Sequence, residues 1–285
     1  MKTYLDCIPC FFRQALKTSR IVTNDEALQE YILKQVSKLI GQLDLLKPPP
    51  YTAYKVYQLI SKLTECEDPY LDIKKASNNL ALKFYPKMKQ LIKESPTPME
   101  TAIRLAIAGN IIDFGAGIEA NKEIIEKSIK SSLQYKISKS VISKLQSSIS
   151  KAENILYIGD NAGEIVFDKL LIEQILPRKI TYVVRGKPII NDVTLVDAID
   201  SGISSLVEVV ENGSSAPGTI LETCSPEFMQ CYNDADLIIA KGQGNYETLN
   251  EERNKIFFLL KVKCAIVAED TASEVGSSLI IRSEQ

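Results

Sequence analysis

The segment NILYIGDNAGEIVFDKLL, residues 154–171, decides the fold. It begins with an apolar run of strand length, 154–159, continues through a polar turn with glycines and enters an amphipathic stretch, 163–176. A short strand, a tight turn and a helix form the repeating unit of a parallel α/β sheet. The segment therefore predicts a sheet whose strands are connected by helices.

The rest of the second half repeats this pattern. Its further apolar runs of strand length are 180–186, 205–210, 235–242 and 263–270. Amphipathic stretches separate several of them, and buried parallel strands typically read as continuous apolar runs. We expect a doubly wound, mainly parallel, Rossmann-like sheet domain over residues 151–285.

The first half has a different texture. Its apolar residues recur at helical spacing, as Ala27, Tyr31, Ile32, Val36 and Ile40 do, and short segments with proline separate the periodic stretches. We expect an all-helical domain over residues 1–150. The fold class is then α/β, with a helical domain followed by the sheet domain.

Composition and charge narrow the function. The chain has 285 residues, with 34 Lys and Arg against 36 Asp and Glu, so its net charge is -2. This balance disfavours nucleic acid and anionic membranes as partners. No run of about 18 apolar residues and no secretory signal occurs. Six scattered cysteines do not resemble a secreted disulfide framework, and we expect a cytoplasmic protein with reduced thiols.

The chain contains no histidine. This excludes Ser-His-Asp and Cys-His nucleophiles, phosphohistidine chemistry, and zinc or iron sites that need imidazole. Hydrolysis would instead use carboxylates, amides, lysine, cysteine or a metal held by oxygen ligands. A divalent metal such as Mg, Mn, Co or Ni suits such ligands.

Polar turns with glycine follow most of the predicted strands, at 159–164, 185–192, 211–218 and 241–247. The carboxyl ends of parallel strands lie at one edge of a sheet, where ligands bind. We therefore expect these turns to converge on one site.

Two of the turns offer ligands for a hard cation. In GDNAGE, Asp160 and Asn161 are adjacent oxygen donors, and in RGKPIIND, Asn191 precedes Asp192, a second carboxylate. GDNAGE alone is equally compatible with a helix N-cap, and for RGKPIIND alone the N-cap is the favoured interpretation. Their occurrence together favours the metal.

KGQGNYE matches neither a Walker loop nor a dinucleotide fingerprint, yet its small residues and Lys241 suit a phosphate. The alternative is a flexible turn with a solvated lysine. In the helical half, Asn110 and Asp113 interrupt the apolar stretch 106–117, either to close over the site or to cap helices. We expect them to face the metal-bearing turns across a cleft. Cys7 and Cys10 have the spacing of half a zinc site, but a pair of buried thiols is the simpler interpretation.

These segments together resemble the metal-dependent damage-control phosphatases, formerly the domain-of-unknown-function family eighty-nine. The likeness extends over nearly the whole chain and includes the N-terminal C-x-x-C of the prokaryote-like branch. The segments that carry it are CIPCFFRQAL, AGNIIDFG, GDNAGE, RGKPIINDVT, ENGSSAPGT, KGQGNYETL and KCAIVAED.

The resemblance implies hydrolysis of small phosphometabolites, with a divalent metal held by Asp160, Asn161 and Asp192. On this basis Asp160, Asp192 and Lys241 are the candidate catalytic residues. The candidate substrate contacts are Asn110, Asp113, Glu164, Asn191 and Lys241. Attack by water and formation of an aspartyl-phosphate on Asp160 both remain open. Two other functions also remain: an S-adenosylmethionine-dependent carboxyl methyltransferase, and a nucleotide- or phosphate-binding module without catalysis.

Overall fold

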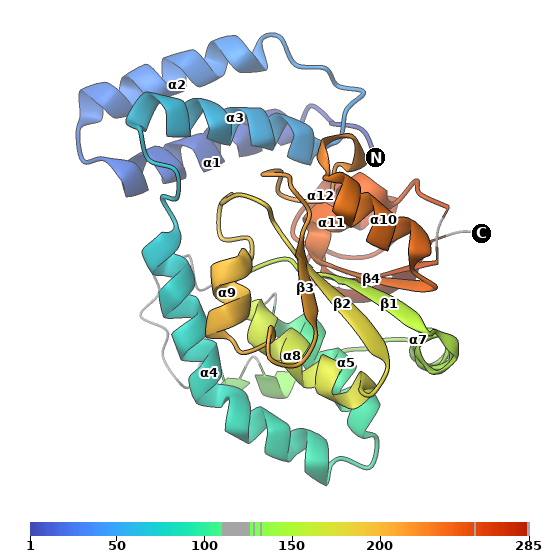
Figure 1. Ribbon diagram of the computed structural model, residues 1–285. Helices are drawn as coiled ribbons and strands as arrows, with labels where there is room; N and C mark the ends of the chain where they lie inside the picture. Colours follow the sequence, from blue (N-terminus) through green and yellow to red (C-terminus); the bar gives the residue numbers. More distant parts are fainter. Residues whose placement is uncertain (110–125, 128, 132, 254, 284–285) are drawn as a thin grey trace.

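The structure, a computed structural model, describes residues 1–109, 126–127, 129–131, 133–253 and 255–283 (Figure 1). Five helices come first: α1 (Cys7–Val22), α2 (Glu26–Ile40), α3 (Pro49–Thr64), α4 (Leu71–Glu94) and α5 (Pro98–Ala108). Among the described residues, none of the helices combines the length and apolar character that crossing a membrane requires.

The rest of the chain alternates helices with six strands. The strands are β1 (Asn154–Ile158), β2 (Lys179–Val184), β3 (Glu208–Glu211), β4 (Leu237–Lys241), β5 (Ile256–Lys261) and β6 (Ser278–Arg282). The helices are α7 (Lys139–Lys151), α8 (Glu164–Ile175), α9 (Leu195–Asp200), α10 (Pro226–Asp234), α11 (Gly242–Leu249) and α12 (Ala265–Asp270), with a short 3₁₀ turn at Leu221–Thr223.

The strands form one sheet in the order β3-β2-β1-β4-β5-β6. The strands β1 to β5 are parallel, and β6 is antiparallel to β5. The predicted fold class, helices followed by a mainly parallel sheet, is confirmed. From β1 the chain winds outward to β3 and then returns to β4 on the other side of β1. The carboxyl ends of β1 and β4 therefore flank the switch point, where ligands bind in such sheets.

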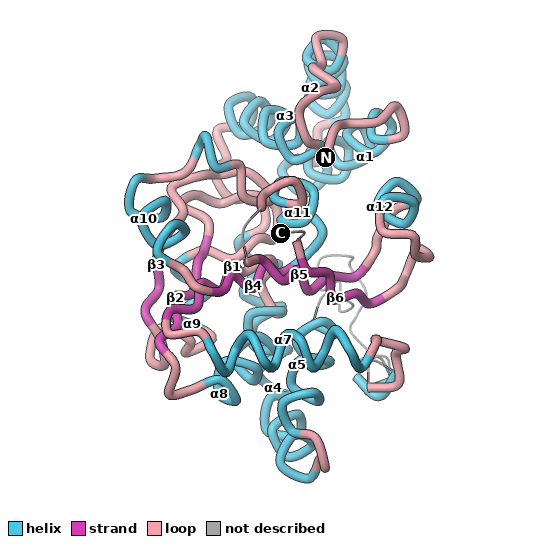
Figure 2. Tube along the Cα trace, turned by 90° about the vertical axis from the view of Figure 1, so that its right-hand side faces the viewer, coloured by secondary structure: helices cyan, strands magenta, loops and turns pink. Residues whose placement is uncertain are grey.

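Helices cover both faces of the sheet (Figure 2). One apolar core joins α4, α5, α7, α8 and α9 to one face, and a second joins α10, α11 and α12 to the other. Strand β4 is buried along its whole length, as expected of a central parallel strand with helices on both sides.

Helices α1, α2 and α3 enclose a core of their own. It is built from residues at helical spacing such as Ile32 and Val36, or Val56 and Ile60. Ile189, from the turn that follows β2, is buried in the same core. This contact ties the three helices to the edge of the sheet that carries the polar turns, and it brings α1 over that edge (Figure 1).

Part of the strand prediction is wrong. The segment 263–270, predicted as a strand, contains α12, while β5 and β6 were not predicted. Only Val267 and Ala268 of α12 are buried, so this helix presents one short apolar face to the sheet. Periodicity does not separate a buried strand from a helix in so short an apolar run. The third predicted strand, 205–210, overlaps β3 but begins earlier.

Candidate active site

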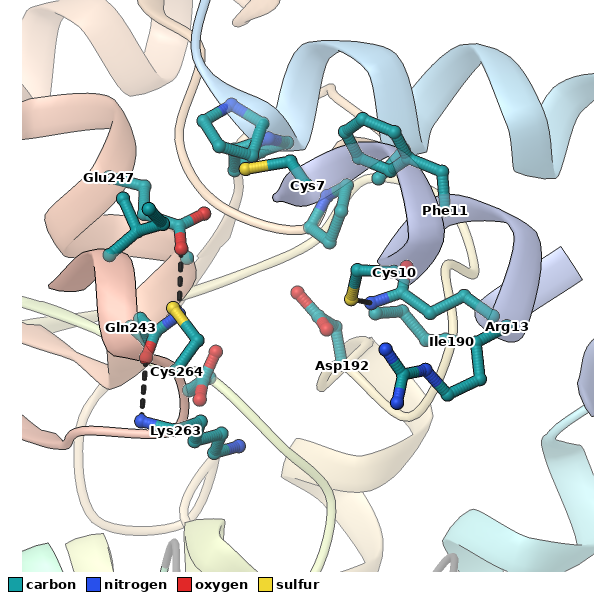
Figure 3. A pocket seen from close by; sticks show the side chains of 18 of the residues that line it. Cys7, Cys10, Phe11, Arg13, Ile190, Asp192, Gln243, Glu247, Lys263 and Cys264 are labelled. Carbon is teal, nitrogen blue, oxygen red and sulfur yellow. Dashed lines mark hydrogen bonds between the residues drawn. The ribbon is translucent and has the colours of Figure 1, made fainter. Parts of the chain in front are cut away.

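A pocket of about 510 Å³ lies between the carboxyl edge of the sheet and helices α1 and α3 (Figure 3). The sheet contributes residues from the turns after all five parallel strands, β1 to β5, with Pro217 from the turn after β3. The helices contribute a mixed wall of apolar side chains, two thiols, one carboxylate, one guanidinium and one amide. The lining residues on the helical side are Asp6, Cys7, Cys10, Phe11, Arg13, Gln14, Pro49, Pro50 and Ala53.

Backbone hydrogen bonds join the GDNAGE and RGKPIIND turns. The amide of Val193 donates to the carbonyl of Asp160 at 2.9 Å, and the amide of Ala162 donates to the carbonyl of Asn191 at 2.8 Å. Asn161 and Asp192 form an isolated antiparallel bridge. The structure thus brings Asp160, Asn161, Asn191 and Asp192 together, and all four line the pocket.

Gly242, the first residue of α11, lies against the Asp160 carboxylate. A Cβ atom at this position would lie 1.9 Å from Asp160 Oδ2, and the glycine has φ of +79°. A side chain is excluded here by both the contact and the left-handed backbone. Gly242, the first glycine of KGQGNYE, is therefore needed to let the chain pass beside this carboxylate.

Arg185 holds the second carboxylate, and sequence reasoning gave this residue no role. Its Nε donates to Asp192 Oδ2 at 2.7 Å, and both side chains are buried. Its other nitrogens donate to Thr219 and Asn245. Burial raises the pKa of Asp192 to about 7; the Arg185 charge opposes this shift and the Asp160 charge adds to it. An arginine at the end of an otherwise apolar strand was the available signal.

Lys241 has a different environment from the predicted one. Its Nζ donates to Glu164 Oε1 at 2.6 Å, to the carbonyl of Ala106 at 2.8 Å, and to Asp168. The side chain is fully buried, and neither Lys241 nor Glu164 lines the pocket. Although burial disfavours its charge, the two carboxylates raise the pKa of Lys241. Among the described residues, its ammonium therefore belongs to an internal ion-pair cluster, and the predicted contact with phosphate stays a prediction.

Two exposed cations line the pocket instead. Lys263 follows β5, and Arg13 lies on α1. Within the described chain, no carboxylate lies within ion-pair distance of either, although Lys263 is near enough to oppose the raised pKa values of Asp192 and Glu247. Sequence reasoning missed Lys263 because it placed the residue inside a predicted strand.

Cys7 and Cys10 are half-buried free thiols in the first turn of α1, and both line the pocket. Burial raises the pKa of both thiols. A further pocket thiol, Cys264, precedes α12. Over the described ranges, no three acidic or thiol side chains are grouped to hold a metal, so the half zinc site is not completed there.

Asn110 and Asp113 lie outside the described residues, and their place opposite the polar turns stays a prediction. A different residue of the helical half contacts GDNAGE. Asn78 of α4 accepts a hydrogen bond from the Gly163 amide at 2.7 Å and donates to Asp197 at 2.8 Å. Both Asn78 and Asp197 are buried, so this contact fixes α4 against the start of α8.

The oxygen donors of the pocket suit a hard divalent cation. Asp160 and Asp192 offer carboxylates and Asn161 an amide oxygen, the ligand types of Mg²⁺ and similar ions. The Asn161 amide nitrogen donates to Asp160 Oδ2 at 2.6 Å, so the two adjacent side chains are held together. The Asp160 charge also adds to the raised pKa values of Asp192 and Glu247. A cation bound here would relieve this accumulated negative charge.

Residues 3–279 match the model of the damage-control phosphatase ARMT1-like domain. The chain belongs to this family. The damage-control phosphatase PH1575 of Pyrococcus horikoshii is 35% identical, over 100% of this chain and 99% of that protein. A damage-control phosphatase of Archaeoglobus fulgidus is 32% identical, with 95% of each chain covered.

A solved structure agrees with the sequence comparisons. The crystal structure of a DUF89 family protein from P. horikoshii superposes with a TM-score of 0.90 at 34% identity, over 100% of each chain. The family resemblance inferred from the turns is confirmed, and with it the phosphatase class.

Proposed function

We propose that this damage-control phosphatase hydrolyses small phosphomonoesters and depends on a divalent cation held by Asp160, Asn161 and Asp192. The observation that supports this most is the backbone pairing of the two turns after β1 and β2, which brings these three oxygen donors into one pocket. Mg, Mn, Co and Ni are the candidate metals because all of them accept oxygen ligands.

When bound, such a cation polarises a phosphoryl oxygen and neutralises charge that develops on it. The chain adds Lys263, whose exposed ammonium is positioned to pair with the other phosphoryl oxygens. Asn191, beside the ligands, lines the same pocket. The apolar part of the α1 and α3 wall, Phe11, Pro49, Pro50 and Ala53, limits the access of bulk water to the ester, which strengthens these charge interactions.

The size of the pocket favours a small metabolite as the substrate. A volume of about 510 Å³ lies within the range of sites that enclose a small molecule. The cations Lys263 and Arg13 lie among its lining residues, and a doubly charged phosphate needs such positive groups. A phosphomonoester with a compact organic group therefore suits both the volume and the charge.

Metal removal tests the proposal. Protein stripped with EDTA and dialysed should not cleave p-nitrophenyl phosphate, and Mg, Mn, Co or Ni should restore phosphate release. Full turnover in excess EDTA would contradict the metal dependence. Methyl transfer from S-adenosylmethionine, with no phosphate released under any metal, would favour the methyltransferase instead.

A further inference from the structure

Glu247 lines the pocket but has no role in the site described so far. It lies on α11, about one helical turn after Gln243, and is half-buried in the sheet-side wall. Figure 3 shows its carboxyl group directed into the pocket, on the side where Cys7 faces it from α1. The group thus faces the helical wall from the sheet side of the pocket that holds the candidate cation ligands.

Neighbouring groups fix the orientation of this carboxyl. Gln243 Nε2 donates to Glu247 Oε1 at 2.7 Å. The Gln243 amide cannot turn around without loss, because its Oε1 accepts from the backbone amide of Lys263 at 2.8 Å. Oε1 of Glu247 is therefore the acceptor of a hydrogen bond, and Oε2 is the oxygen that carries a proton in the neutral acid.

The surroundings favour the protonated form of this carboxyl. Burial raises the pKa of Glu247 to about 7; Gln243, the N-terminal ammonium and Lys263 oppose the shift, and Asp160 adds to it. From α1, Cys7 and Cys10 face the group as neutral thiols, because burial raises their pKa values as well. A carboxyl with these properties is matched to proton transfer near pH 7.

We propose that Glu247 is the general acid of the reaction and delivers its proton to the leaving oxygen of the phosphomonoester. This inference rests on the proposed phosphatase function. For the route by direct attack of water, the water oxygen forms a bond to phosphorus while the bond between phosphorus and the ester oxygen breaks. The ester oxygen takes the Glu247 proton and leaves as an alcohol. The proton lost by the water passes to solvent, and solvent protonates Glu247 again. The chain has no imidazole for this step.

The dependence of rate on the leaving group tests the role. An alkyl phosphate loses a strongly basic alkoxide and needs the proton, whereas p-nitrophenyl phosphate loses a weakly basic phenolate and needs it far less. For Glu247→Gln we expect kcat on an alkyl phosphate to fall by about 10²-fold or more, and kcat on p-nitrophenyl phosphate to fall much less. Wild-type kcat on the alkyl phosphate should decline as pH rises above the Glu247 pKa of about 7, and the variant should lose that decline.

Two further variants complete the experiment. Glu247→Asp keeps a proton donor on a shorter side chain and should recover part of the alkyl activity. Glu251→Gln is the matched control: Glu251 follows α11, is 82% exposed and pairs with the N-terminus, so this variant should behave as wild type.

Three results would overturn the inference. One is an equal fall on both substrates for Glu247→Gln, which would indicate a structural role. A second is a loss of Mn²⁺ affinity in Glu247→Gln, measured by calorimetry, which would make Glu247 a metal ligand. The third is wild-type protein without phosphatase activity under any of the four metals, which would remove the proposed function and this inference with it. In the first two results the metal-dependent activity of the wild type persists. A failure of the general-acid role can therefore be distinguished from a failure of the proposed phosphatase function.

Discussion

Two acidic clusters lie at the carboxyl ends of β1 and β4, and they differ in how their charge is balanced. The buried cluster, Glu164 and Asp168, has Lys241 at its centre, and Tyr157 and Tyr182 donate to Asp168. In the pocket cluster, Asp160 and Asp192, Arg185 pairs with Asp192, and the two turns that carry these carboxylates are joined side by side. The first is satisfied from within the protein, and the second is suited to a cation from outside.

The comparison makes its strongest prediction for Asp160. Asp160→Asn removes a carboxylate from the pocket cluster, and kcat/KM should fall by about 10³-fold because a bound cation supplies several kcal/mol to the transition state. Steady-state kinetics with saturating Mn²⁺, together with calorimetry for metal affinity, measures the effect.

Asp168→Asn, in the buried cluster, is the contrasting variant. It should lower the melting temperature while the folded protein keeps its metal affinity, because Asp168 is fully buried and does not line the pocket. The contrast fails if Asp160→Asn keeps the metal affinity and the rate of the wild type. That result would show that the turn after β1, residues 159–164, only caps a helix.

The next effect concerns Lys241. Lys241→Met leaves Glu164 and Asp168 without their common partner, and breaking a buried ion pair in this way costs about 3–5 kcal/mol of stability. Urea denaturation should show this loss, whereas KM of the fraction that remains folded should change little. If Lys241→Met kept wild-type stability but bound substrate more weakly, Lys241 would be a phosphate-binding residue, as the sequence predicts.

Lys263 should show the reverse pattern. Lys263→Ala removes an exposed pocket cation, and the loss of a charge-assisted contact with phosphate is worth about 1.5–3 kcal/mol, or roughly 10- to 100-fold in kcat/KM. The melting temperature should not change, since the side chain is exposed. Lys255→Ala, just before β5 at the opposite edge of the sheet, is the control; equal losses in both variants would point to net charge alone.

Some features of the site could be predicted from the sequence alone, and others could not. The turns after β1 and β2 could be predicted as ligand-bearing because polar residues that follow apolar strands gather at one edge. The face of the sheet to which the side chain of one strand residue points could not be predicted in this way. Lys241 ends β4, where successive side chains point to opposite helix layers, and its side chain enters the layer of α5 and α8. The role of Arg185 could not be predicted for the same reason, because it depends on an ion pair with Asp192 on the other side of a turn.

The division of the chain near residue 150 stays a prediction. Helices α4 and α5 share a continuous apolar core with the sheet, while α1, α2 and α3 form a separate core. Helical periodicity identifies the helices of the first half but does not indicate which surface each of them covers, because the partner surface lies far away in the sequence.

The smallest effect separates the contributions within the buried cluster. Tyr182 donates to Asp168 Oδ2 at 3.0 Å, and Tyr157 donates to Oδ1 at 2.8 Å. Tyr182→Phe keeps the ring stacked on Tyr157 and removes one hydrogen bond to a charged group, which is worth about 1.5–3 kcal/mol. We expect a destabilisation near the lower limit, because the ion pair with Lys241 remains, and no change in metal affinity. A loss of metal affinity without a loss of stability would mean that the two clusters act as one, since the hydroxyl touches only the buried cluster among the described contacts.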